Sequence, residues 1–242
     1  MRRRRKKGVR RNFSRVKKIV RWILKRKFLT FCLCAFLAFS FVGKCSKNDY
    51  TYRSAEEIAY LKLLKILYSG RGRQVNVESA KYVIAQACSF AEQVENNPLW
   101  DSPDVRDLLL ITAYVETNLY PRFQDKGGDA IGLFQIEYGT YRDLWRRAIP
   151  LHYPKLHQAM RQRFGNAQNG EILFEDLQKN DVLSALFARV KYFESNIPVP
   201  NANDTNAQAE YYKRIYNTAK GKANVEKFKN AKSALESAFT KK

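Results

Sequence analysis

Apolar residues recur every three or four positions through most of the chain beyond residue 53. This spacing is typical of helices that bury one face, and no run alternates convincingly at the period of two that marks strands. We therefore expect a mainly α domain over residues 54–242, with at most a small hairpin in the loop 122–133. The predicted helices cover about residues 54–68, 77–95, 103–120, 141–148, 155–164, 174–178, 181–193, 207–218 and 225–239.

The first predicted helix opens with a capping box, Ser54-Ala55-Glu56-Glu57, and a stop signal follows at Ser69-Gly70. Its helical spacing indicates which apolar side chains turn inward. These are Ile58, Leu61, Leu64 and Leu67.

The helix over residues 103–120 carries the most informative side chain, Glu116. Ser102-Pro103-Asp104 is its start signal: a hydroxyl cap, a proline where an N–H has no helical partner, and an acid in the first turn. Glu116 falls in the last turn, at the edge of an apolar stripe. Burial there is expected to raise the pKa of the carboxyl toward neutrality, as a general acid requires. A solvent-facing glutamate at a helix end is the alternative.

The segment after this helix combines a loop with a short apolar run. Residues 123–132 are rich in Gly and Asp, and Gly132-Leu133-Phe134-Gln135-Ile136 then places one amide among apolar side chains. A glycine lets the backbone approach a ligand closely, and a glutamine offers both a donor and an acceptor to sugar amides and hydroxyls. The pair of segments therefore favours a site that binds a saccharide.

These residues carry a resemblance to a known family. Glu116-Thr117-x-x-x-Pro121 followed by Gly132-Leu133-Phe134-Gln135-Ile136 resembles two signatures of the lytic transglycosylases in the lysozyme-like superfamily. Downstream, residues 180–192 resemble the family's Asn-led third helix, and residues 215–221 resemble its Ala-Tyr-Asn-Ala-Gly element, with departures at the first and last positions.

The resemblance implies a lysozyme-like, transglycosylase-type fold and assigns roles to residues. Glu116 would be the catalytic acid, and the Tyr of the last element, Tyr216, would orient its carboxyl. No metal or cofactor is implied. The residues implied to contact the substrate are Thr117, Gly132, Leu133, Phe134, Gln135, Tyr192, Tyr216 and Asn217.

The implied reaction is cleavage of the β-1,4 bond between N-acetylmuramic acid and N-acetylglucosamine in peptidoglycan, with 1,6-anhydromuramoyl products. A muramidase similar to goose-type lysozymes is the alternative, because hydrolysis needs a second acid. The candidates for that acid are Asp125 and Asp129 in the loop, and Glu137 after it. A non-catalytic glycan-binding scaffold is a further alternative, although it would have no reason to retain Glu116.

The positive charge of the chain is concentrated at the N-terminus. The net charge is +21, but fifteen Lys and Arg fall within residues 1–27, and the chain beyond Asp49 is only mildly basic. An uncharged apolar run follows at residues 28–42, so we interpret the basic block as the cytoplasmic flank of a membrane segment and not as a nucleic-acid arm. Residues 28–43 are predicted to be a single-pass inner-membrane anchor and residues 44–53 a spacer, which places the domain in the periplasm.

Several alternatives remain open for this arrangement. Residues 28–43 also suit a signal peptide, in which case the domain is secreted after cleavage. The partners would be peptidoglycan strands and the membrane, and the owner would be a bacterium remodelling its wall, an envelope-spanning secretion apparatus, or a phage with a virion-associated enzyme.

The cysteines and histidines show no metal-ligand spacing. Cys32 and Cys34 fall in the apolar run, and Cys45 and Cys88 are either a disulfide or, for Cys88, a buried thiol. The two histidines, at positions 152 and 157, are interpreted as surface residues.

Overall fold

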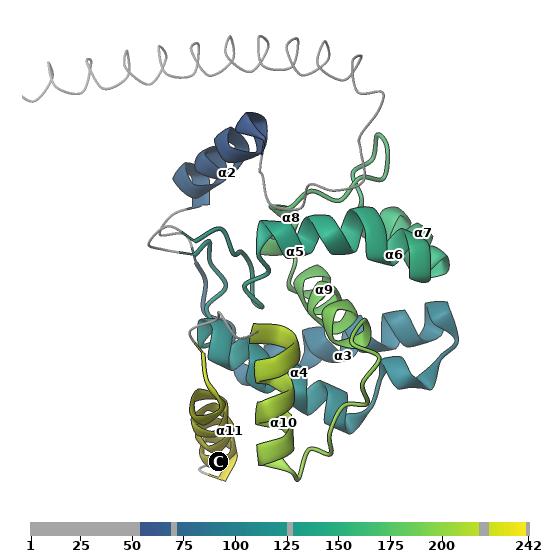
Figure 1. The fold of residues 1–242 in the computed structure, drawn as a ribbon. Coiled ribbons are helices and arrows are strands. Elements are labelled where there is room, and N and C mark those ends of the chain that lie inside the picture. The colour runs from purple at the N-terminus through teal and green to yellow at the C-terminus, as the bar shows by residue number, and fades with distance from the viewer. Residues whose placement is uncertain (1–53, 69–71, 125–127, 218–222, 241–242) are drawn as a thin grey trace, which may run out of the picture. The chain divides into compact units, whose positions relative to one another are not determined.

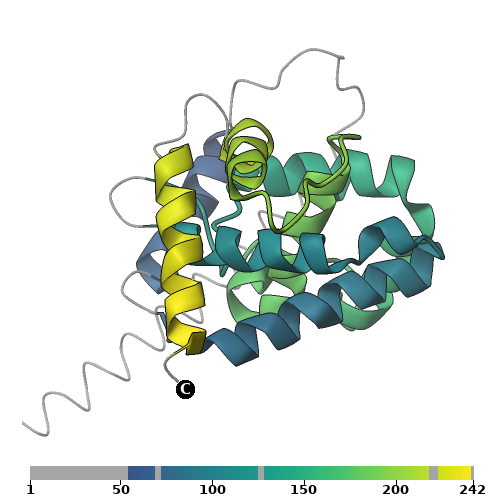
Figure 2. The same ribbon diagram turned by 90° about the horizontal axis from the view of Figure 1, so that it is seen from below.

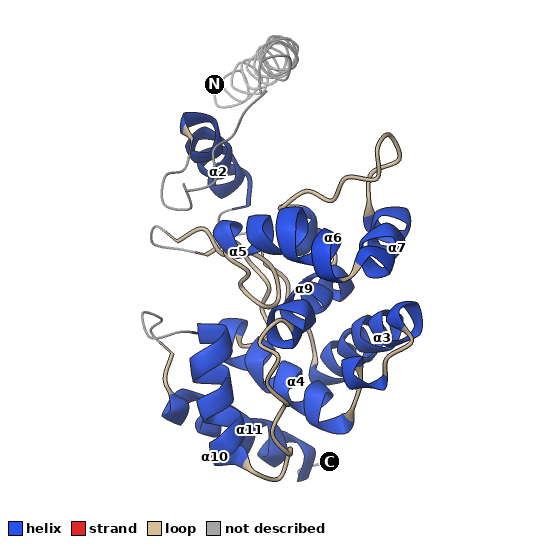
Figure 3. Ribbon diagram, turned by 45° about the vertical axis from the view of Figure 1, so that its right-hand side comes forward, coloured by secondary structure: helices blue, strands red, loops and turns tan. Residues whose placement is uncertain are grey.

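A computed structural model describes residues 54–68, 72–124, 128–217 and 223–240. The described residues contain helices and loops but no strand (Figure 3). An isolated bridge between Ile131 and Ile136 overlaps only the end of the loop 122–133, in which a small hairpin was the most that was expected. The mainly α prediction is confirmed. The predicted segments 1–27, 28–43 and 44–53 lie outside the described residues. Among the helices of the described part of the chain, none is long and apolar enough to span a membrane.

The helices follow one another along a compact unit, Ser54–Lys242, as Figure 1 shows. In chain order they are α2 (Ala55–Tyr68), α3 (Val77–Glu95), η2 (Pro98–Trp100), α4 (Pro103–Thr117), α5 (Tyr138–Asp143), η3 (Leu144–Ala148), α6 (Ile149–His152), α7 (Pro154–Phe164), α8 (Asp176–Lys179), α9 (Asp181–Phe193), α10 (Thr205–Tyr211), η4 (Tyr212–Asn217) and α11 (Val225–Thr240).

Local capping explains where these helices begin. The Ser54 hydroxyl accepts from the Glu57 N–H at 3.1 Å, and the Glu57 carboxylate accepts from the Ser54 N–H at the same distance, so the capping box is formed. Ser102 caps α4 by accepting from the Val105 N–H at 3.2 Å. Asn118 ends α4 in the left-handed conformation, with φ 52°.

The core is organised around α9, which is buried along nearly its whole length and contacts α3, α4, α8, η3 and η4. Arg189 is buried with it, and its guanidinium donates to the carbonyls of Trp100 and Leu99. On the other side of the domain, α11 packs against both α10 and α4 (Figures 1 and 2). Near the C-terminal end of α4, Lys227 of α11 donates to the Val115 carbonyl and Tyr212 of η4 donates to the Glu116 carboxyl.

Two predicted helices differ from the structure in a related way. The helix expected at 141–148 extends from Tyr138 to His152, and both it and the helix after Asp204 contain a π-helical segment, η3 and η4. A π turn holds more than four residues, so it rotates the following side chains relative to an α-helix. In η4 this rotation applies to the tyrosines nearest Glu116.

Candidate functional site

Glu116 lies at a surface cleft formed by the end of α4, the chain after it, and α11. Asn118 ends α4 in the left-handed conformation, and residues of its last turn line the cleft together with Lys227, Asn230 and Ala231 of α11. The cleft has a volume of about 410 Å³. Its lining residues are Tyr114, Val115, Glu116, Thr117, Asn118, Arg122, Lys227, Asn230 and Ala231.

A tyrosine from η4 holds the Glu116 carboxyl. The Tyr212 hydroxyl donates to Glu116 Oε1 at 2.6 Å, and the Asn217 side-chain amide lies 3.4 Å from the same hydroxyl. The Tyr212 ring is fully buried and packs on Phe228 of α11, with ring centroids 5.2 Å apart. Burial and the nearby Glu116 raise the pKa of Tyr212, so this phenol remains a hydrogen-bond donor.

Burial raises the pKa of Glu116 above that of an ordinary glutamate. The Tyr212 hydrogen bond and the positive charges of Lys227 and Lys191 act in the opposite direction, and the charge of Glu137 adds to the rise. The two lysines are fixed nearby: Lys227 donates to the Val115 carbonyl and Lys191 to the Tyr216 carbonyl, each at 2.7 Å. Desolvation therefore prevails over the cations, and the pKa of the carboxyl lies above that of an ordinary glutamate.

This arrangement suits proton transfer. A carboxyl with a raised pKa keeps its proton to a higher pH than an ordinary glutamate and so can deliver it to a bound molecule, and a fixed hydroxyl donor stabilises the carboxylate that remains. Because Tyr212 occupies Oε1, the other carboxyl oxygen is the one expected to exchange a proton with a bound molecule. The side chain expected from the sequence is thus in an environment suited to a general acid.

Gly132 is required by its surroundings. Its φ is +80°, and a Cβ there would lie 2.4 Å from the Leu177 carbonyl oxygen. Its N–H donates to Gln178 Oε1 at 3.2 Å. The glycine therefore permits close packing of this turn against α8, whereas a ligand was the partner expected from the sequence.

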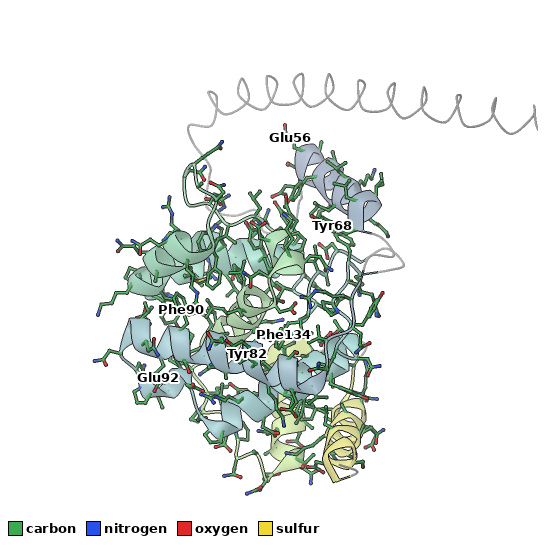
Figure 4. All side chains as sticks on the ribbon, turned by 180° about the vertical axis from the view of Figure 1, so that it is seen from behind. Glu56, Tyr68, Tyr82, Phe90, Glu92 and Phe134 are labelled. Carbon is green, nitrogen blue, oxygen red and sulfur yellow. The ribbon has the colours of Figure 1, made fainter. Side chains whose placement is uncertain are left out.

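Three neighbouring residues expected to contact a substrate are buried. Leu133 and Phe134 have no exposed side-chain surface, and Figure 4 shows Phe134 in the middle of the side chains between the helices. Thr117 is 2% exposed, and its hydroxyl lies 2.8 Å from the Ala113 carbonyl and 3.1 Å from the Leu133 carbonyl. Leu133 and Phe134 are not among the described residues that line the cleft, whereas Thr117 lines it with little exposed surface.

Gln135 ties the loop together. Its amide nitrogen donates to the Arg122 carbonyl at 2.8 Å and to the Gly132 carbonyl at 3.1 Å, and its backbone has a positive φ of 46°. A structural role for this amide therefore has direct geometric support. A substrate role would use the rest of the side chain, which is partly exposed.

The two tyrosines expected in the cleft lie in the core. Tyr216 is 4% exposed and donates to the Phe134 carbonyl at 2.7 Å, and the Tyr192 hydroxyl lies 2.8 Å from the Thr112 hydroxyl. The expectation that Tyr216 orients Glu116 is wrong, because Tyr212 makes that contact. The sequence did contain a sign of Tyr212, because it is a second tyrosine about one helical turn before Tyr216 on the same element. Asn217 lies close to the site through Tyr212 and also accepts from Lys213 at 2.9 Å.

The three candidates for a second acid differ in where they lie relative to the cleft at Glu116. Asp125 lies outside the described residues. Asp129 is partly buried and is not among the described residues that line the cleft. Glu137 is exposed, and its charge raises the pKa of Glu116. Glu137 is therefore the candidate acid whose charge acts on Glu116.

The remaining polar residues show little further chemistry. Within the described ranges, no group of three or more His, Cys, Asp or Glu side chains could hold a metal ion. Cys88 is fully buried, while its possible partner Cys45 lies outside the described residues. His152 is exposed and pairs with Glu194 at 3.0 Å, and His157 is partly buried.

Comparison of the chain with protein-family models, with curated proteins and with solved structures finds no match in any of the three.

Proposed function

We propose that the domain is a lysozyme-like enzyme that cleaves peptidoglycan strands as a lytic transglycosylase, with Glu116 as its acid and base. The observation that carries the proposal is the Glu116 carboxyl at the cleft, with a pKa raised by burial and a 2.6 Å hydrogen bond from Tyr212. The family motifs around Glu116 and Gly132 add the substrate class. The domain's helical architecture is compatible with this class.

In the proposed reaction Glu116 donates its proton to the glycosidic oxygen between N-acetylmuramic acid and N-acetylglucosamine. The bond from C1 to that oxygen breaks, and the muramoyl ring carries the positive charge. The resulting Glu116 carboxylate, stabilised by Tyr212, then takes the proton of the ring's own C6 hydroxyl. The C6 oxygen bonds to C1, which gives a 1,6-anhydro product and returns the proton to Glu116. No water enters, so a single acid is sufficient.

The charge of the cleft supports an anionic strand as the substrate. Arg122 and Lys227 both line it, together with two amide side chains, Asn118 and Asn230. Peptidoglycan carries carboxylates on its muramoyl lactyl groups and peptide stems, which cationic side chains attract, while amides suit its hydroxyl and acetamido groups.

A muramidase is the second candidate, and one observation favours it. The negative charge of Glu137 raises the pKa of Glu116, so a second carboxylate acts on the same site. Hydrolysis needs such a group to activate a water or attack the sugar, at about 5–10 Å from the first acid. Glu137 is, however, exposed and on the chain that follows the Gly132 turn.

Mass spectrometry of digested sacculi separates the two. Anhydro-ended products support the transglycosylase, and products heavier by one water, with free reducing ends, identify a muramidase. Binding of glycan strands with no product of either kind would favour the non-catalytic scaffold.

The proposal includes a location. The basic block at residues 1–27 and the apolar run at 28–43 would place the domain on the periplasmic side of the inner membrane. Protease accessibility of a tag added after Lys242 tests this directly. A tag protected in spheroplasts would put the domain in the cytoplasm, away from peptidoglycan.

A further inference from the structure

Exposed apolar side chains are concentrated on α2. Of the nine large hydrophobic residues that are exposed in the described part of the chain, four lie on this one helix, and the other five lie singly on three helices and in two loops. The four are Ile58, Leu63, Ile66 and Leu67, with exposed fractions of 42%, 46%, 77% and 44%. The first and last of them were expected to face inward.

The opposite face of α2 holds it to the domain. Leu61 and Leu64 are its buried residues. Glu57 pairs with Arg142 of α5 at 2.9 Å, and Tyr60 hydrogen-bonds Glu175 and packs on Tyr138. The exposed apolar side chains therefore point away from the domain because the docked face is already fixed.

Lysines accompany the exposed apolar residues. The second half of α2 reads Lys62-Leu63-Leu64-Lys65-Ile66-Leu67, in which Lys62 is exposed and Lys65 partly exposed. A helix with an apolar surface and flanking lysines is typical of segments that lie in a membrane interface, because the apolar side chains enter the acyl boundary and the ammonium groups reach anionic headgroups.

We propose that the outer face of α2, defined by Ile58, Lys62, Leu63, Ile66 and Leu67, lies on the surface of an anionic lipid bilayer. This goes beyond the proposed cleavage reaction and does not depend on it, but the choice of a bilayer as the occupant rests on the proposed membrane segment at residues 28–43.

Chain length supports the bilayer as the occupant. The uncharged apolar run at residues 28–42 ends twelve residues before α2 begins. Twelve residues reach at most about 40 Å, so a membrane that holds residues 28–42 is within reach of α2.

A second copy of the chain fits this face less well. A symmetric contact would bring Lys62 and Lys65 of one copy toward those of the other, and like charges repel. Four side chains on a helix of 14 residues also offer far less than the roughly 1,000 Å² that a stable interface needs.

Lipid photolabelling of the full chain tests the proposal. The chain is reconstituted into phosphatidylcholine vesicles with or without phosphatidylglycerol, each containing a lipid with a photoactivatable acyl chain, and labelled peptides are mapped by mass spectrometry. We expect labelling of residues 58–67 well above that around Tyr82 of α3, which is 65% exposed but has no comparable apolar neighbours on its helix. Figure 4 labels Tyr82, the reference position on α3, and Glu56 at the start of α2.

Variants make the test specific. Ile66→Asn with Leu63→Asn changes exposed side chains, so the domain should melt as before while labelling of α2 falls to the level at Tyr82. Lys62→Gln and Lys65→Gln should each reduce the gain from phosphatidylglycerol by about fivefold. Labelling of α2 no higher than at Tyr82, or unchanged by the double variant, would overturn the proposal, as would cross-links between the α2 helices of two chains. Cleavage of soluble glycan strands by the variants reports separately on the enzymatic proposal.

Discussion

The contact between Tyr212 and Glu116 gives a sharp test of the site, because a second tyrosine in η4 provides a matched control. Tyr212→Phe removes one oxygen and keeps the ring that packs on Phe228. The lost hydrogen bond, 2.6 Å long and made to a carboxylate in the ionised state, is worth about 1.5–3 kcal/mol. If the bond is fully used in the transition state, the loss corresponds to about a 10- to 100-fold fall in kcat/KM.

The pH dependence of kcat/KM in Tyr212→Phe distinguishes loss of the hydrogen bond to Glu116 from general damage to the fold. The Tyr212 hydrogen bond lowers the pKa of Glu116, so its removal should raise that pKa further. Since the acid must be protonated to act, activity falls as pH rises through this pKa, and the alkaline limb of kcat/KM should move to higher pH in Tyr212→Phe.

Tyr216→Phe is the control. Its hydroxyl donates to the buried Phe134 carbonyl, so the variant should lose about 1–3 kcal/mol of unfolding free energy. The alkaline limb should stay in place. Activity on labelled glycan strands across pH, run beside thermal melts, gives both quantities. A shifted limb in Tyr216→Phe with an unshifted one in Tyr212→Phe would refute the assignment of Tyr212.

Three further outcomes follow from the same geometry. Gln135→Ala should cost about 1–3 kcal/mol in a denaturant melt, because the Arg122 and Gly132 carbonyls lose their donor; an unchanged melt with lost turnover would instead make Gln135 a saccharide ligand. Glu137→Gln should move the alkaline limb to lower pH, since Glu137 raises the pKa of Glu116, and loss of all activity would make it the second acid of a muramidase. Glu116→Gln should melt at a higher temperature than the wild type, and this difference in melting temperature should grow as pH rises through the raised pKa of Glu116. In acid, below the ordinary glutamate pKa, the difference should vanish. A difference in melting temperature that does not change with pH would contradict the burial argument.

Features with local causes could be predicted from the sequence. The start of α4 at Ser102, the capping box of α2 and the bounds of α3 and α9 depend on side chains within a few residues of each helix end. The position of Glu116 in the last turn of α4 follows from the same signals, and so does its desolvated setting, because the apolar stripe beside it is visible in the spacing.

Features that depend on tertiary packing could not be predicted. Leu133 and Phe134 occur in a motif expected at the cleft, yet their direction is set by the turn at Gly132 against α8. Tyr216 and Tyr212 are four residues apart, and the π-helical segment decides which of them reaches Glu116. Helical spacing on α2 does not specify which side the domain covers, so the inward direction expected for Ile58 and Leu67 was wrong.

The proposed reaction requires the Glu116 carboxyl to donate the proton that breaks the glycan strand. Release of soluble muropeptides from purified sacculi by Glu116→Gln tests it most directly, because the amide keeps the size of the side chain and can still accept from Tyr212 but cannot act as an acid. Glu78→Gln, the same change at an exposed glutamate in the first turn of α3, is the control. We predict a fall of several orders of magnitude for Glu116→Gln with a cooperative melt, and wild-type release for Glu78→Gln. Turnover above about a tenth of the wild-type rate in Glu116→Gln would contradict the account.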